Sequence, residues 1–319
     1  MLPRLRTPRR NRIAVLVGAM AVGCATHPGV SQQGDTARPA GLMVPGDLER
    51  LPSQPPDRVV AYGTDSSQYG ELRIPTGAGP HPVAVLIHGG CFKAAYATRR
   101  DLEAMGDALR ADGIATWNVE YRRLGQTGGG WPGTYLDIAS AVDHLRVLAR
   151  QHPLDLSRVV IVGHSAGGHL AMWAAGRERV PAGSAIRSDN PLRVRGVLDL
   201  AGPVDLTADI AEYEAVCHDS VLTQLLGGTP AMVPDRYAHA SPKQLVPLGV
   251  PQVLLLGEFD DNMPRPQAES YVRTASKAGD PVRLIVIPGL GHFEVANPRA
   301  KSWPQVEAAI RSLLDGRLP

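Results

Sequence analysis

The sequence predicts an α/β protein with a mostly parallel central sheet and helices on both of its faces. Short apolar runs rich in β-branched residues alternate with helical patterns over most of the chain, and this alternation is typical of a parallel sheet. The chain has 319 residues, of which 44% are hydrophobic and 20% are charged. That composition supplies enough apolar side chains for the core of one large domain.

The individual elements follow from the apolar patterns. Val59–Tyr62 and Tyr69–Ile74 are predicted to be two paired edge strands joined by a polar turn. Further strands are expected at residues 83–88, 114–121, 158–162, 194–200, 252–256 and 282–287. Helices are expected directly after Ser165 and at residues 98–111, 137–150, 266–278 and 303–314, where apolar residues recur at helical spacing.

Residues 203 to about 240 break this alternation. The stretch is mixed in composition and holds Cys217 and the pair Gly227-Gly228. We therefore predict a small cap insertion that lies over the functional site.

The first 23 residues resemble a secretory signal. Met1–Arg12 carries five arginines and no acid, and Ile13–Gly23 is apolar but too short for a stable membrane span. Cys24 follows three small or apolar residues, which resembles a bacterial lipoprotein cleavage box. We expect an exported protein of the periplasm or cell envelope. Cys24 is a candidate for lipidation and membrane attachment, and ordinary signal cleavage nearby is the alternative.

Residues 24–56 are polar, proline-rich and aperiodic. They predict a mostly disordered tether, with order returning near Leu48 and the main domain covering residues 57–319. Removing residues 1–23 turns the formal net charge from +2 to −3. The excess of basic residues therefore lies in the predicted signal segment, and no nucleic-acid partner is expected.

One strand-to-helix turn carries the clearest chemical signal. An apolar run ends at Gly163-His164-Ser165-Ala166-Gly167, and a helix-forming segment follows at once. Glycines on both sides of the serine let strand and helix approach closely, and such a turn projects the hydroxyl from the sheet edge. We therefore predict that Ser165 is a catalytic nucleophile. A glycine-rich turn without chemistry is the plain alternative.

A serine nucleophile needs a base, and the base needs an orienting acid. His292 lies on a glycine-flanked loop after the last predicted strand, where it can reach Ser165. The loop after the preceding strand offers Glu258, Asp260 and Asp261, and Asp260 stands where that loop should turn toward the histidine. His164 and His169 flank the serine in sequence and are expected to point elsewhere.

Backbone N–H groups can stabilise a developing oxyanion where side chains do not crowd them. His88-Gly89-Gly90-Cys91 directly follows a predicted strand. We expect donors from Gly90 and Cys91, together with Ala166 beside the nucleophile. The thiols of Cys91 and Cys217 could form a disulfide or could both remain free.

These motifs resemble the α/β-hydrolase superfamily, whose members order the three residues as serine, acid and histidine. The resemblance covers about residues 57 to 316. More closely, the residues His88-Gly89-Gly90, the serine turn, Gly257 with Asp260-Asp261, and Gly291-His292-Phe293 look like the bacterial acetyl-esterase/lipase group. That group lies near the hormone-sensitive-lipase and kynurenine-formamidase-like branches. The stretch Asn118 to Arg123 also looks like this group, in which its Tyr-Arg pair supports the oxyanion loop.

The resemblance implies a Ser165-Asp260-His292 hydrolase with no cofactor and no metal. The leading hypothesis is an esterase that acts on small acyl esters through an acyl-enzyme. The alternative is an amide hydrolase, either a formamidase or a small peptidase. A non-catalytic envelope binding protein is a third hypothesis, and it would predict the loss of a triad residue.

Overall fold

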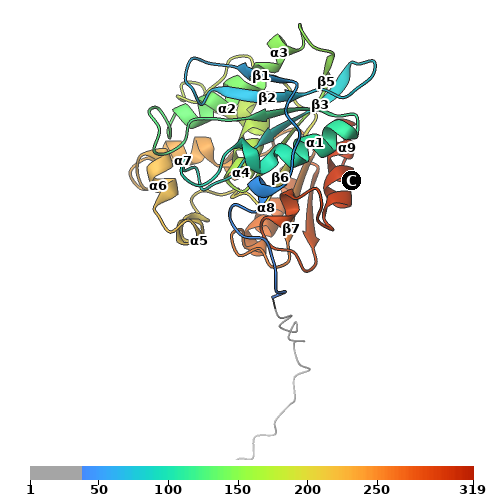
Figure 1. Cartoon of the computed structure of the whole chain (residues 1–319). Helices are drawn as coiled ribbons and strands as arrows, with labels where there is room; N and C mark the ends of the chain where they lie inside the picture. The colour runs from blue at the N-terminus through green and yellow to red at the C-terminus, as the bar shows by residue number, and fades with distance from the viewer. Residues whose placement is uncertain (1–37) are drawn as a thin grey trace, which may run out of the picture. The chain divides into compact units, whose positions relative to one another are not determined.

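A computed structural model describes residues 38–319, so the predictions for the signal segment 1–23 and for Cys24 lie outside it. In these residues eight strands form one sheet in the order β1-β2-β4-β3-β5-β6-β7-β8 (Figure 1). β1 (Arg58–Ala61) and β2 (Tyr69–Arg73) pair antiparallel at the edge, and β2 also runs antiparallel to β4. The remaining pairs are parallel. The parallel strands are β3 (His81–Ile87), β4 (Ala115–Val119), β5 (Leu154–His164), β6 (Gly196–Leu200), β7 (Gln252–Gly257) and β8 (Val282–Ile287).

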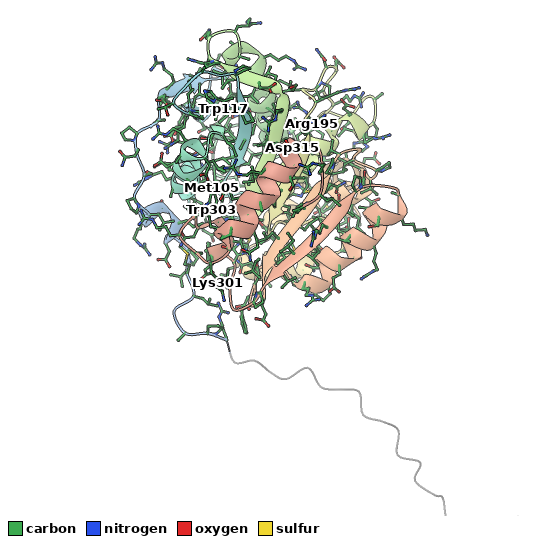
Figure 2. All side chains as sticks on the ribbon, turned by 90° about the vertical axis from the view of Figure 1, so that its right-hand side faces the viewer. Met105, Trp117, Arg195, Lys301, Trp303 and Asp315 are labelled. Atoms are coloured by element: carbon green, nitrogen blue, oxygen red, sulfur yellow. A yellow bond between two sulfur atoms is a disulfide. The ribbon has the colours of Figure 1, made fainter. Side chains whose placement is uncertain are left out.

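The central strands are buried on both faces. Every residue of β4, β6 and β7 is buried, which explains why they read as continuous apolar runs. On one face α1 (Glu103–Ala111) and α9 (Trp303–Leu314) lie side by side, and Arg311 donates to the Asp112 carbonyl at 3.2 Å. Figure 2 looks onto this face, with α9 running across the sheet from Trp303 toward Asp315. The opposite face carries α2 (Gly133–Asp143), α4 (Ala166–Gly176) and α8 (Arg265–Lys277).

The predicted helix at residues 137–150 differs from the structure at both ends. It starts earlier, at Gly133, and divides near His144 into α2 and the single turn α3 (Leu145–Leu148). Pro132 occupies the N-cap of α2. A proline there removes no helical hydrogen bond, because the first N–H groups of a helix have no partner within it.

Three short helices lie between β6 and β7, in the region predicted to be an inserted cap. They are α5 (Ile210–Val216), α6 (Val221–Leu226) and α7 (Pro234–Ala240), and they gather at one side of the molecule (Figure 1). Single 3-10 turns occur at Leu48–Arg50, Arg99–Leu102, Arg177–Arg179, Pro242–Gln244 and Glu294–Ala296, labelled η1 to η5 in chain order. Among the described residues, no helix is long and apolar enough to cross a membrane.

Residues 38–56 depart from the prediction of a disordered tether up to residue 56. The segment from Arg38 onward belongs to the same compact unit as the sheet. Leu48 is 1% exposed, and the Met43 N–H donates to the Glu294 carboxylate. This segment has no apolar period of its own. Its order comes from contacts with distant residues, which a local pattern does not reveal.

Candidate active site

Ser165 lies at the apex of a sharp turn between β5 and α4. Its backbone has φ 56° and ψ −124°, a conformation that non-glycine residues rarely adopt. The flanking glycines are required sterically: a Cβ on Gly163 would lie 2.0 Å from the Gly167 carbonyl oxygen, and one on Gly167 would lie 2.0 Å from the Ile87 carbonyl oxygen. The Ser165 N–H donates to the Leu200 carbonyl at 2.8 Å. The sequence therefore folds into the strained turn that the motif predicts.

The structure brings His292 and Asp260 together behind this turn. Nδ1 of His292 lies 3.1 Å from one Asp260 carboxylate oxygen and 3.0 Å from the other. An ionised carboxylate only accepts hydrogen bonds, so Nδ1 carries the proton and Nε2 is left free as a base. The competing acids lie elsewhere: Glu258 accepts from the Gly289 N–H at 2.8 Å, and Asp261 pairs with Arg38.

The Asp260 carboxylate is held in its ionised form. Burial by itself raises its pKa, but the charge and hydrogen bond of His292 outweigh this effect. The N–H groups of Asn262 and Met263 donate to Asp260 at 2.8 and 2.9 Å and act in the same direction. The net pKa therefore lies below the ordinary value, and the acid remains an acceptor for His292.

We refer to residues 88–92, the loop that follows β3, as the oxyanion loop after its predicted role. Three successive residues of this loop have left-handed backbone conformations. The φ angles are 99° at Gly90, 51° at Cys91 and 56° at Phe92. A Cβ on Gly89 would lie 2.9 Å from the Ser165 Cβ, so the loop passes directly beside the nucleophile. Across the described residues, the N–H groups of Gly90 and Cys91 donate no backbone hydrogen bond. They remain available to a ligand, as does the N-terminus of α4 at Ala166.

A network of buried polar side chains contacts this loop and the residues that follow it. The Tyr121 hydroxyl donates to the His88 carbonyl at 2.8 Å, and Arg123 donates to the Ala97 carbonyl. Glu120 lies 3.1 Å from Nε2 of His88 and 2.7 Å from Arg123 Nη2. Burial opposes its ionisation, but His88 and Arg123 prevail and lower the pKa of Glu120 to about 2. The stretch that carried the family resemblance therefore contacts the oxyanion loop.

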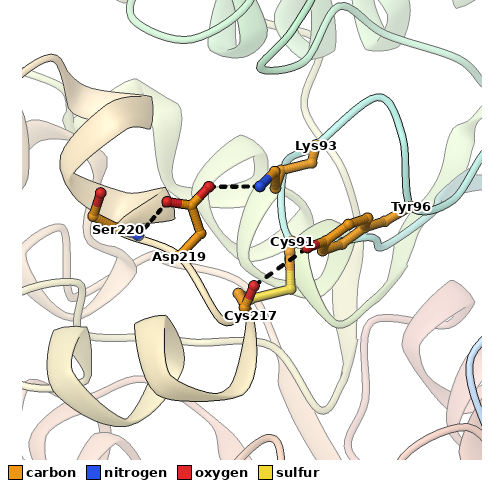
Figure 3. The surroundings of a disulfide bond; sticks show 6 residues. All are labelled: Cys91, Lys93, Tyr96, Cys217, Asp219 and Ser220. Atoms are coloured by element: carbon orange, nitrogen blue, oxygen red, sulfur yellow. Dashed lines mark hydrogen bonds and ion pairs between the residues drawn. A yellow bond between two sulfur atoms is a disulfide. The ribbon is translucent and has the colours of Figure 1, made fainter.

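Three contacts join the oxyanion loop to the cap (Figure 3). Cys91 and Cys217 form a disulfide with their Cα atoms 5.9 Å apart. Lys93 Nζ lies 2.5 Å from the Asp219 carboxylate, and the Tyr96 hydroxyl donates to the Cys217 carbonyl at 3.4 Å. We refer to these contacts together as the loop–cap clamp. The sequence left the cysteine pairing open because their separation of 126 residues gives no information on proximity.

The expectation that His164 points away from the site is wrong. Its ring centroid lies 4.7 Å from that of His292, and Nε2 lies 3.0 Å from the His292 carbonyl oxygen. Burial and the neighbouring imidazole lower the pKa of His164 to about 3, so it stays neutral and packs against the catalytic histidine candidate. His169 is buried away from the cavity, with Nε2 3.0 Å from the Tyr135 hydroxyl.

Ser165 and His292 line one cavity of about 520 Å³. Both are almost buried, with 7% and 6% exposure. The other walls of the cavity come from the N-terminal segment, the oxyanion loop with the residues after it, the cap and the loop that carries Asp260. They include residues 38, 43–46, 90–91, 95–97, 101, 216–218 and 262. The sequence prediction missed the N-terminal wall. A second cavity of about 320 Å³ is lined by residues 174–175, 177–179, 191–194 and 248–250, which hold no serine, cysteine or histidine.

Within residues 38–319, no cluster of three or more histidine, cysteine or carboxylate side chains is placed to hold a metal ion. The arrangement is suited to nucleophilic chemistry by side chains and backbone amides. It combines a serine on a strained turn, an imidazole oriented by a carboxylate, and N–H groups beside the serine that donate no hydrogen bond among the described residues.

Comparisons with known proteins place the chain among its relatives. The BD-FAE family model matches residues 72–274. Esterase LipC of Mycobacterium tuberculosis is 26% identical over 256 residues, which cover 79% of this chain and 63% of LipC. The acylamino-acid-releasing enzyme of Rattus norvegicus is 29% identical over 224 residues, which cover 66% of this chain and 28% of that enzyme. The match thus spans less than two thirds of either relative.

Among solved structures, esterase B of Lactobacillus rhamnosis superposes with a TM-score of 0.67 at 20% identity. The superposition covers 84% of this chain and 89% of that one. At this identity the likeness shows a shared fold.

Proposed function

The chain belongs to the BD-FAE family and has the α/β-hydrolase fold, and on that premise we propose that it cleaves small carboxylic esters through an acyl-enzyme. The observation that carries the proposal is His292, whose Nδ1 lies 3.0 Å from Asp260 while its ring lines the same cavity as Ser165. The contact between His292 and Asp260 is the one that serine hydrolases require between base and acid, and the shared cavity supports Ser165 as the nucleophile. The similarity to proteins named as esterases supports the same reaction class.

In the proposed reaction, Ser165 Oγ attacks the ester carbonyl carbon while Nε2 of His292 takes the hydroxyl proton. The N–H groups of Gly90, Cys91 and Ala166 would stabilise the oxyanion, and each such donor is typically worth about 3 kcal/mol of barrier. Asp260 stabilises the imidazolium. The imidazolium then protonates the leaving alcohol as the carbon–oxygen bond breaks. Water, deprotonated by His292, hydrolyses the acyl-serine by the same steps.

Hydrolysis of p-nitrophenyl acetate tests the proposal. The wild-type protein should turn over the ester, and Ser165→Ala should lower kcat at least a thousandfold without changing the melting temperature. A fluorophosphonate should label wild-type protein at Ser165 and leave the variant unlabelled. Equal turnover by both proteins would rule out the serine mechanism.

Amide cleavage is a second candidate, favoured by the similarity to the acylamino-acid-releasing enzyme. The same nucleophile, base and oxyanion donors can cleave an amide. Activity on N-formylkynurenine or on an acetylated amino-acid amide should be compared with activity on p-nitrophenyl acetate in one preparation. A higher kcat/KM for either amide would make the amide hydrolase the better description.

We further propose that the protein is exported and that Cys24 attaches it to a membrane. The Cys91–Cys217 disulfide supports export, because such bonds persist in oxidising compartments. Mass spectrometry of the mature N-terminus tests the attachment. Acylated Cys24 is the expected result, and an unmodified N-terminus elsewhere would indicate ordinary signal cleavage.

A further inference from the structure

The cap contains a tyrosine hydroxyl that is buried without a hydrogen-bond partner. Tyr213 lies on α5 and is 3% exposed. Among residues 38–319, its Oη atom is one of the buried side-chain atoms that form no hydrogen bond. A buried hydroxyl of this kind costs free energy, because it has given up its hydrogen bonds to water. The hydroxyl therefore lowers stability, and its presence needs another explanation.

The contacts of α5 hold the Tyr213 ring against the oxyanion loop. The Cys217 N–H donates to the Tyr213 carbonyl at 3.0 Å, so the two residues lie one helical turn apart on the same side of α5. Cys217 forms the disulfide with Cys91 of the oxyanion loop. The centroid of the Tyr213 ring lies 6.0 Å from that of Phe92, the next residue of this loop. The disulfide and the aromatic contact therefore fix Tyr213 beside the loop that flanks Ser165.

The Tyr213 hydroxyl has the nucleophile as a neighbour. Burial raises the pKa of Tyr213 above its ordinary value, and the Ser165 side chain acts on it as a hydrogen-bonding group in the opposite direction. The phenol is therefore protonated at neutral pH and is able to donate. The two hydroxyls form no hydrogen bond of normal geometry in the structure. Catalytic hydrogen bonds are often poorly aligned in a free enzyme and tighten when substrate binds.

We propose that Tyr213 is a further catalytic residue, whose hydroxyl donates a hydrogen bond to Ser165 Oγ when that oxygen carries developing negative charge. This inference rests on the proposed ester hydrolysis. In acylation, Ser165 gives its proton to Nε2 of His292 as Oγ bonds to the carbonyl carbon. In deacylation, the bond between the acyl carbon and Oγ breaks, and His292 returns the proton to Oγ. Tyr213 keeps its own proton in both steps and lowers each barrier through its hydrogen bond.

The role of Tyr213 differs from that of the backbone amides of the oxyanion loop. Those amides would stabilise the charge on the carbonyl oxygen, whereas Tyr213 stabilises the charge on the attacking and leaving serine oxygen. A hydrogen bond to a charged group is stronger than one between neutral groups. The contact with Tyr213 is therefore worth more in the transition state than in the resting enzyme, which is the condition for catalysis.

Tyr213→Phe tests the inference, and Tyr237→Phe is its matched control. Tyr237 lies on α7 of the cap, is 2% exposed and donates from its hydroxyl to the Gly228 carbonyl at 3.2 Å. Tyr213→Phe should lower kcat for p-nitrophenyl acetate roughly tenfold or more, with a urea unfolding midpoint equal to or above that of wild type. Tyr237→Phe should show the reverse, with a lower midpoint and kcat within about twofold of wild type.

Two further measurements separate a catalytic role from a structural one. Stopped-flow hydrolysis of p-nitrophenyl acetate resolves acylation from deacylation, and both rates should fall in Tyr213→Phe because both steps use Oγ. Site-specific replacement of Tyr213 by 3-fluorotyrosine keeps the ring and makes the phenol a stronger donor. Its kcat should be at least that of wild type, so that kcat increases with donor strength from phenylalanine through tyrosine.

Three results would overturn the inference. The first is a Tyr213→Phe variant whose kcat stays within about twofold of wild type. The second is a fall in kcat together with a lower urea midpoint and a 3-fluorotyrosine variant as slow as the phenylalanine variant, which would mean that Tyr213 only packs the cap against the loop. The third is a rise in kcat, which would mean that the hydroxyl holds Ser165 away from His292. Hydrolysis that survives Ser165→Ala would instead refute the proposed function itself.

Discussion

Replacing both cysteines of the loop–cap clamp by serine should lower kcat for ester hydrolysis more than it lowers substrate affinity. Cys91 and Phe92 hold φ angles of 51° and 56°, and each left-handed non-glycine residue costs roughly 1–2 kcal/mol. The loop therefore stores about 2–4 kcal/mol of strain that its surroundings must offset. Without the disulfide, relaxation of the backbone at residue 91 would turn its N–H away from the oxyanion. The loss of one donor predicts a fall in kcat of roughly 10²–10³-fold.

The disulfide should also stabilise the fold. It closes a loop with a sequence separation of 126 residues, for which chain entropy predicts at most about 5 kcal/mol. Serine at position 91 keeps the backbone N–H, so any loss of kcat reflects loop geometry. Lys93→Met is the control: its ion pair with Asp219 is 24% and 32% exposed, and water screens such pairs.

The assay is steady-state hydrolysis of p-nitrophenyl acetate by wild-type protein, by the double serine variant and by Lys93→Met. Urea unfolding of each gives the free energy of unfolding. Wild-type protein reduced with dithiothreitol should behave like the double variant. The reasoning is refuted if the double variant, folded under the assay conditions, keeps kcat within twofold of wild type. The disulfide would then stabilise the protein without shaping the loop.

Three further predictions concern buried carboxylates. The pKa of Glu120 is lowered to about 2, so its ionised form contributes up to about 3 kcal/mol of stability above pH 4.5, which is lost as pH falls toward 2. Urea unfolding should show Glu120→Gln less stable than wild type at pH 7 and nearly equal at pH 2. Burial raises the pKa of Asp101 to about 6, so its ionised form has the opposite effect and lowers stability at high pH. Asp101→Asn should therefore gain up to about 3 kcal/mol at pH 8, measured by urea unfolding, with the gain shrinking below pH 6 and vanishing below pH 4. Asp260→Asn should lower kcat roughly 10³–10⁴-fold because His292 loses its orienting acceptor, whereas Asp261→Asn should stay within twofold; equal effects of the two would contradict the choice of Asp260.

The local sequence pattern was sufficient to predict most of the strands and helices. The predicted strand at residues 282–287 and helix at residues 303–314 coincide with β8 and α9. The turn at Ser165 was also predictable, because Gly163 is required by a close contact with the backbone of Gly167, within the same short motif. Hydrophobic periodicity and turn chemistry are local properties, so a single sequence carries them.

The candidate site was only partly predictable. Ser165 and His292 follow strands whose carboxyl ends meet at one sheet edge, so topology alone brings them near each other. The choice among Glu258, Asp260 and Asp261 depends on how one loop bends, and the structure places Asp260 against the histidine. The three acids are neighbours in sequence and chemically alike, so composition does not separate them.

By itself the sequence determined the α/β class, the order of the elements and the nucleophile turn. Tertiary structure decided the rest: the ordering of residues 38–56, the Cys91–Cys217 pairing and the contact of Asp260 with His292. These features depend on contacts between segments that are far apart in the chain. Their free energy comes from burial and from partners that exist only in the folded protein, so no short-range pattern encodes them.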